Sequence, residues 1–149
     1  MLQTRRTQLR LRAATRAWWA VLPFACASAA AAQPPTAPLT AVDRRIELIE
    51  GALAEAHFRS ALGLTRSALA LLDPLAPENA VALRRARLEV LAATAEVARG
   101  RKLQARDHLV RALCADPSLI LDERETSPRL LALLPEARRL AARADGLPR

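Results

Sequence analysis

Aromatic and β-branched residues are scarce in this chain of 149 residues, which has no Tyr, two Phe and two Trp. Because these residue types favour β-strands, their scarcity argues against a mainly β fold. The chain contains instead 34 Ala, 27 Leu and 22 Arg, three residue types near the top of the helix-propensity ranking. The composition therefore predicts an all-α protein.

Residues that commonly build catalytic, metal and phosphate sites are also few. The chain has two His, two Cys and four Gly, with no His-x-x-x-His pair, no Cys-x-x-Cys and no Gly-rich loop. These absences argue against an enzyme, and we expect no catalytic residue, metal ligand or cofactor. The alternative is a small enzyme or redox factor that uses His108 or Cys114, the sole thiol if the N-terminal segment with Cys26 is removed.

Positive charge is concentrated at the N-terminus. The formal net charge is +8, but five Arg and no acidic residue lie within residues 1–32. Residues 33–149 carry 18 basic and 15 acidic residues, a surplus of three. A nucleic-acid-binding protein of this size should keep a larger surplus, so the sequence argues against a polynucleotide partner.

Residues 1–32 have the organisation of a signal peptide. Arginines from Arg5 to Arg16 precede an uncharged stretch over 17–32, and Ala30-Ala31-Ala32 offers a small-x-small cleavage site before Gln33. The uncharged stretch is shorter than the roughly 20 apolar residues of a spanning helix. We expect a periplasmic or secreted protein that contacts the membrane only through an uncleaved or lipidated N-terminus.

Two features leave the export route open. Arg5-Arg6 lies in a segment that resembles the twin-arginine export motif, with Gln8 where that motif has Phe. Cys26 resembles a bacterial lipoprotein cysteine, with Pro23 where that family has Leu. If it is not lipidated, Cys26 is a small apolar residue of a segment that is removed.

Helical patterns separated by helix breakers follow a Pro-rich segment. Three prolines in residues 33–41 predict an extended linker. Apolar residues then recur every three or four positions, with Thr40 as the expected first N-cap, and the helical domain should span 42–146. The five expected helices cover 42–56, 58–72, 78–99, 103–115 and 128–146, the third ending at Gly100 and the last kinking or breaking at Pro135.

The first four helices show signs of an internal repeat. A shift of 44 residues superposes Ile46 on Val90 and Ala61 on Ala105. The second helix of each pair carries Ala, Ala-Leu and Asp-Pro in the same order, as Ala61, Ala68-Leu69 and Asp73-Pro74, then Ala105, Ala112-Leu113 and Asp116-Pro117. This pattern resembles the tetratricopeptide repeat over roughly residues 42–117. A non-repetitive helical bundle is the alternative, because 44 exceeds that family's period of roughly 34.

The resemblance implies a short α-solenoid of two antiparallel helix pairs and a C-terminal capping helix. We expect this last helix to cover the apolar side of the fourth helix, which holds Leu109 and Leu113. Otherwise a second copy of the chain has to cover that side, and the protein would be a homo-oligomer.

The resemblance also implies a function, because the first helices of such repeats line a groove that binds peptides or protein domains. We expect an exported bacterial interaction or adaptor module with a protein partner in the cell envelope. The residues at matching groove positions are Asp43, Ile46, Glu50, Leu53, Arg87, Val90, Thr94 and Val97. The alternative is a helical bundle that binds an anionic envelope surface through its arginines, although charged runs are ordinarily solvated faces paired with acids such as Glu89 and Glu96.

Overall fold

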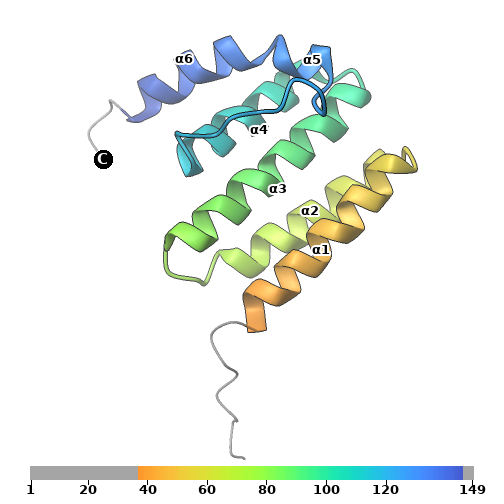
Figure 1. Ribbon diagram of the computed structural model, residues 1–149, viewed down its shortest axis with the longest axis vertical. Coiled ribbons are helices and arrows are strands. Elements are labelled where there is room, and N and C mark those ends of the chain that lie inside the picture. The colour runs from red at the N-terminus through yellow and green to blue at the C-terminus, as the bar shows by residue number, and fades with distance from the viewer. Residues whose placement is uncertain (1–36, 146–149) are drawn as a thin grey trace, which may run out of the picture. The chain divides into compact units, whose positions relative to one another are not determined.

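The computed structural model describes residues 37–145, and within this range the chain is helical without a strand (Figure 1). The prediction of an all-α fold is confirmed. The expected signal peptide, Cys26 and residues 33–36 of the expected linker lie outside the described residues. The helices are α1 (Ala37–Ala54), α2 (Phe58–Leu72), α3 (Asn79–Ala98), α4 (Lys102–Ala115), α5 (Pro128–Leu131) and α6 (Leu134–Asp145).

Helix α3 is the centre of the packing. It contacts α1, α2, α4 and α5, while α1 also packs against α2, and α4 against α6. Its buried residues accordingly lie on several sides of the helix, among them Val81, Leu88, Ala93 and Val97. The sequence already indicated this, because apolar residues in this segment are not confined to one stripe.

Two clusters of buried side chains form the core. One is built around Val42, Ile46 and Ile49 of α1 and Leu72 of α2. The other joins α3 and α4 to the C-terminal helices. Burial of a large aliphatic side chain stabilises the fold by about 1.5–3 kcal/mol.

The C-terminal helices cover α4, as the sequence predicted. Leu130 of α5 and Ala137 and Ala141 of α6 are buried in the same cluster as Leu109 and Leu113. The predicted break near Pro135 is also confirmed, since α5 ends at Leu131 and Pro135 is the second residue of α6. Proline is tolerated there because the first helical N–H groups have no partner within the helix.

The start of the last helical segment follows from its capping residues. Ser127 has extended backbone angles, and its Oγ accepts a hydrogen bond from the Leu130 N–H at 3.3 Å. Pro128 occupies the first turn, where its fixed φ suits a helix.

The N-terminus of the domain differs from the expectation. Helix α1 begins at Ala37, so the extended linker predicted over 33–41 is wrong for residues 37–41, and Thr40 lies inside the helix. Pro38 is the second helical residue, where its ring costs no hydrogen bond, and Leu39 packs against the first core cluster. The apolar contact of Leu39 extends the helix by more than a turn beyond the predicted start.

The junctions α1–α2 and α3–α4 are built alike. After α3, Gly100 has a φ of +77°, its N–H donates to the Val97 carbonyl, and the Arg101 N–H donates to the Glu96 carbonyl. This is the Schellman arrangement that glycine favours, and it confirms that Gly100 ends the helix. After α1, Ala56 has a φ of +58°, and its N–H donates to the Leu53 carbonyl. Ala56 and Leu53 lie 44 positions before Gly100 and Val97.

Candidate functional site

Two ion pairs join α1 to α3 across one face of the domain. The guanidinium of Arg84 bonds both carboxylate oxygens of Asp43 at 2.8 Å, and Arg87 Nη2 bonds Glu50 Oε1 at 2.6 Å. Asp43 precedes Glu50 on α1, and their partners Arg84 and Arg87 follow in the same order on α3. Helices α1 and α3 therefore run in the same direction. The hydrogen bond from Arg84 lowers the pKa of Asp43, more than burial raises it, and the same bond raises the pKa of Arg84.

The expected groove residues divide between this face and the core. Arg87 is exposed, and Asp43, Glu50, Leu53, Val90 and Thr94 are partly exposed. The side chains of Ile46 and Val97 are only 3% and 6% exposed. These two residues support the face from beneath and present almost no surface to a partner.

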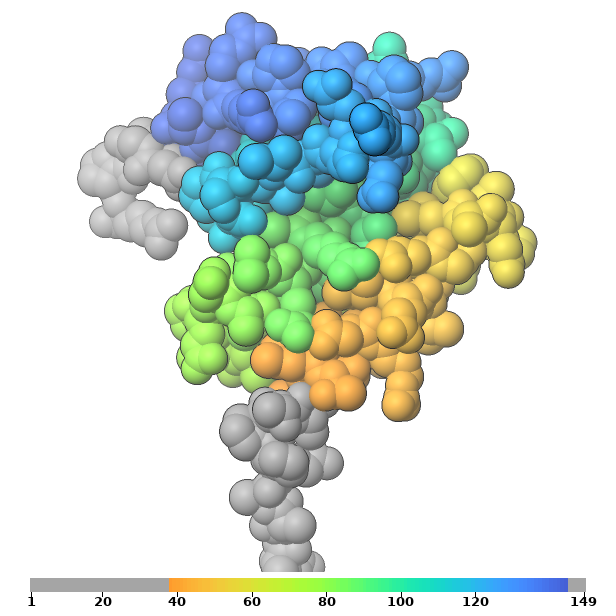
Figure 2. Space-filling view, viewed as in Figure 1, coloured from red at the N-terminus to blue at the C-terminus, as the bar shows by residue number. Residues whose placement is uncertain are grey.

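A row of α3 side chains continues along the exposed face. Leu83, Arg87, Val90 and Thr94 follow each other at intervals of four, three and four residues, so they share one side of the helix. Leu83 is 48% exposed. The Thr94 hydroxyl donates to the Val90 carbonyl at 3.0 Å, so it is satisfied within the helix. In Figure 2 this part of α3, in green, lies between α1 in orange and the connection to α5 in cyan and blue.

At its C-terminal end this row opens into a hollow. A cavity of about 430 Å³ is lined by Thr94, Val97 and Ala98 of α3 together with residues 127–129. We define the recognition face as the exposed side of α1 and α3 from Asp43 and Leu83 to this cavity. Leu83 is exposed, whereas Ala86, Ala93 and Val97, which follow it at helical spacing, are buried.

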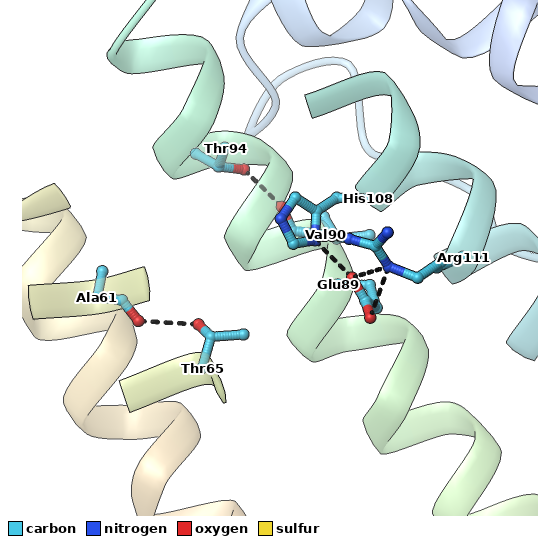
Figure 3. A network of polar contacts seen from close by, with 7 residues as sticks. All are labelled: Ala61, Thr65, Glu89, Val90, Thr94, His108 and Arg111. Carbon is cyan, nitrogen blue, oxygen red and sulfur yellow. Dashed lines mark hydrogen bonds and ion pairs between the residues drawn. The ribbon is translucent and has the colours of Figure 1, made fainter. Parts of the chain in front are cut away.

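The second polar centre links α3 to α4 and was not foreseen from the sequence. Glu89 is 4% exposed, and its carboxylate lies 2.6 Å from His108 Nδ1 and 3.2 Å from Arg111 Nε (Figure 3). Glu96, two helical turns further along α3, is 7% exposed. The expectation that these two glutamates belong to solvated faces is wrong. The i, i+7 spacing places both on one side of α3, toward neighbouring helices. Glu89 pairs with His108 and Arg111 of α4, and Glu96 pairs with Arg99, three residues further on, and with Arg101.

His108 and Cys114, the two residues of the enzyme alternative, lie on different sides of α4. His108 and Cys114 lie six residues apart on α4, which is about 240° around the axis. His108 is held by Glu89 and Arg111, and Cys114 is exposed. Glu89 thus gives His108 a structural contact between α3 and α4.

Residues 37–145 contain no group of three or more His, Cys, Asp or Glu side chains that could hold a metal ion. In the same range, no helix has the length and apolar character needed to cross a bilayer.

Comparisons of the chain with protein-family models, curated proteins and solved structures give no match.

Proposed function

We propose that this chain is an exported bacterial protein-interaction module, arranged like a short tetratricopeptide repeat, whose recognition face binds a protein or peptide partner. The observation that carries the proposal is the mixed row on α3, in which Leu83 is 48% exposed and the half-buried Val90 lies beside the Glu50–Arg87 pair. Protein interfaces commonly combine apolar side chains at the centre with polar groups around them.

The arrangement of the helices supports the repeat-like part of the proposal. The two junctions have equivalent backbone bonds 44 residues apart, at Ala56 and Gly100. Helices α1 and α3 run in the same direction and lie next to each other. In stacked helix pairs, first helices placed in this way form a shared binding surface.

The domain offers a partner a preformed surface. The Asp43–Arg84 and Glu50–Arg87 pairs hold polar side chains at fixed places across α1 and α3, and α6 covers the other end of the core through Ala137 and Ala141. Preformed surfaces bind with a smaller entropic cost than segments that fold on binding. This suits an adaptor without catalytic activity.

A photo-crosslinking amino acid placed in the row tests the recognition face directly. Introduced at Leu83, it should capture a discrete partner in living cells of the native host, because Leu83 is the most exposed apolar member of the row. Introduced at Leu103, which is 63% exposed on α4, it should not. Equal capture at the two positions would contradict a specific recognition face.

Export is tested independently by the N-terminus of the protein in its host. Edman sequencing of the purified protein should begin near Gln33, because the small-x-small site ends at Ala32. Recovery of the chain with Met1 from the cytoplasm would contradict export and leave the recognition face to be judged by crosslinking.

A further inference from the structure

A second groove lies between α2 and α4, with α3 as its floor. It encloses about 410 Å³, and its lining comes from α2, α3, α4 and the α3–α4 junction. A neighbouring hollow of about 460 Å³ around His57 and Phe58 shares Arg59 and Arg99 with it. We call these two connected hollows the basic groove.

Basic side chains stand on both walls of this groove. Arg59 and Arg66 lie seven residues apart on α2, on the same side of the helix and about 10 Å apart along it. Both are exposed, and neither forms an ion pair with another described residue. Helix α2 contains no acidic residue. On the opposite wall, Arg101 and His108 are again seven residues apart.

The groove carries more positive than negative charge. Its lining includes the four guanidinium groups of Arg59, Arg66, Arg99 and Arg101 and one carboxylate, Glu96. That carboxylate lies 3.4 Å from Arg99 Nη1 and 3.9 Å from Arg101 Nε. Glu96 therefore faces the junction arginines, and the two α2 arginines are left with no described counter-charge.

Apolar side chains also line the groove. Leu62 and Leu69 follow the α2 arginines at intervals of three residues, and Ala92 is the apolar residue that α3 contributes beside Glu96. The Thr65 hydroxyl adds no free polar group, because it donates to the Ala61 carbonyl at 2.9 Å (Figure 3). A ligand that fills the groove should therefore combine apolar groups with negative charge.

We propose that the basic groove binds an acidic amphipathic segment of a partner protein, with carboxylates at the two basic walls and apolar side chains against the apolar lining. Acidic side chains two helical turns apart would match the spacing of Arg59 and Arg66. A bilayer surface would meet the arginines but not the recessed floor. A nucleic acid would find one aromatic side chain, Phe58, in place of a stacking platform.

This site is separate from the recognition face. Ala92 and Glu96 of its lining lie about 140° and 180° around α3 from Arg87. Occupation of one surface therefore leaves the other accessible, and the domain can join two partners.

The probe is a fluorescent peptide of Leu and Glu with its glutamates two helical turns apart, titrated with the mature chain and followed by anisotropy. Binding should be saturable and should weaken as salt is added. The double variant Arg59→Glu/Arg66→Glu should bind the peptide at least tenfold more weakly, a loss of about 1.4 kcal/mol or more of binding free energy. Because both side chains are exposed and unpaired, the variant should keep the helical circular-dichroism spectrum of the parent.

The matched control is Arg138→Glu/Arg139→Glu, which makes the same change in net charge on exposed positions of α6. It should leave peptide affinity nearly unchanged. Equal weakening by both double variants, or no binding by the parent, would overturn the site. Binding to phosphatidylglycerol vesicles or polyphosphate without peptide binding would overturn the protein partner in favour of an anionic surface or polyanion. Neither result depends on Leu83, so failure here is distinguishable from failure of the recognition face.

Discussion

The two helix pairs have similar backbone arrangements but different side chains at equivalent positions. Positions 44 residues apart connect the helices of each pair, through Arg45 and Ser67 in the first and through Glu89 and Arg111 in the second. The first link is a guanidinium donating to a hydroxyl, and the second is a charge pair with a carboxylate that is 4% exposed. The stability of the two helix pairs should therefore depend to very different degrees on the side chains at these equivalent positions.

The apolar filling of the two pairs differs in the same manner. Ile49 and Ala93 are equivalent and both fully buried, as are Thr65 and Leu109 at 1% and 0% exposure. The larger apolar residue lies on the first helix in one pair and on the second helix in the other. Since cores are close-packed, such an exchange keeps the total volume similar while changing which helix supplies it.

The largest expected effect comes from removing the C-terminal helices, which cover the second helix pair. Deletion of residues 128–149 removes Leu130, Ala137 and Ala141 from the second cluster and uncovers Leu109 and Leu113. We expect unfolding stability to fall by about 3 kcal/mol or more, or the chain to self-associate. Urea unfolding and sedimentation velocity measure both. Deletion of residues 146–149 is the control, and a monomeric, fully stable 128–149 deletion would rule out the capping role.

The polar links should respond unequally. His108→Ala/Arg111→Ala leaves Glu89 buried without a partner, which should cost about 3 kcal/mol. Ser67→Ala at the equivalent link should cost less than about 1 kcal/mol, since Arg45 is only partly buried and can turn to water. Chemical denaturation provides the comparison. Adding Glu89→Leu to the double variant should recover most of the loss, and failure to recover would show that the carboxylate is not its cause.

The junctions should respond in opposite directions. Ala56→Gly relieves a left-handed backbone conformation in a residue with a Cβ and should stabilise the fold by about 0.5–1 kcal/mol. Gly100→Ala imposes that strain and should destabilise it by about 1 kcal/mol. Apart from its chain neighbours, no residue has an atom within 4 Å of where a Cβ at Gly100 would lie, so the difference isolates backbone strain. Thermal unfolding measures both, and changes of the same sign would contradict equivalent junctions.

The smallest expected effect concerns pH and the Asp43–Arg84 pair. Its hydrogen bond lowers the folded-state pKa of Asp43, so the pair stabilises the fold above the unfolded pKa of about 3.9. This stability is lost as pH falls through the folded pKa. The Asp43 side chain is 48% exposed, so the contribution stays below about 1 kcal/mol. The stability difference between the parent and Asp43→Asn should shrink toward acid pH, and a constant difference would exclude the pair.

The sequence predicted the parts of the fold that depend on neighbouring residues. The breaks at Gly100 and near Pro135 follow from backbone chemistry at those positions, and the apolar spacing located α2 within its bounds. The early start of α1 was missed because Pro38 reads as a linker residue until the apolar contact of Leu39 is known.

The sequence predicted less of the candidate surfaces, because these depend on contacts between residues far apart in the chain. Glu89 and His108 are separated by 19 positions, and no local pattern shows that the carboxylate is buried. The shared side of Glu50 and Arg87 was expected from the family resemblance and agrees with their 2.6 Å contact. The basic groove needed the relative placement of α2 and α4, although the seven-residue spacing of Arg59 and Arg66 was already a signal.

Charge reversal on α3 tests the central claim most directly. Partner capture from the native envelope should be measured for the mature parent, for Arg87→Glu and for Arg138→Glu/Arg139→Glu. Arg87 is exposed, so its reversal should change stability by only about 0.5 kcal/mol while placing a second negative charge beside Glu50 on the recognition face. We expect Arg87→Glu to lose capture of the partner crosslinked at Leu83 and the α6 variant to retain it. Retained capture by Arg87→Glu together with loss in the α6 variant would contradict recognition through α1 and α3.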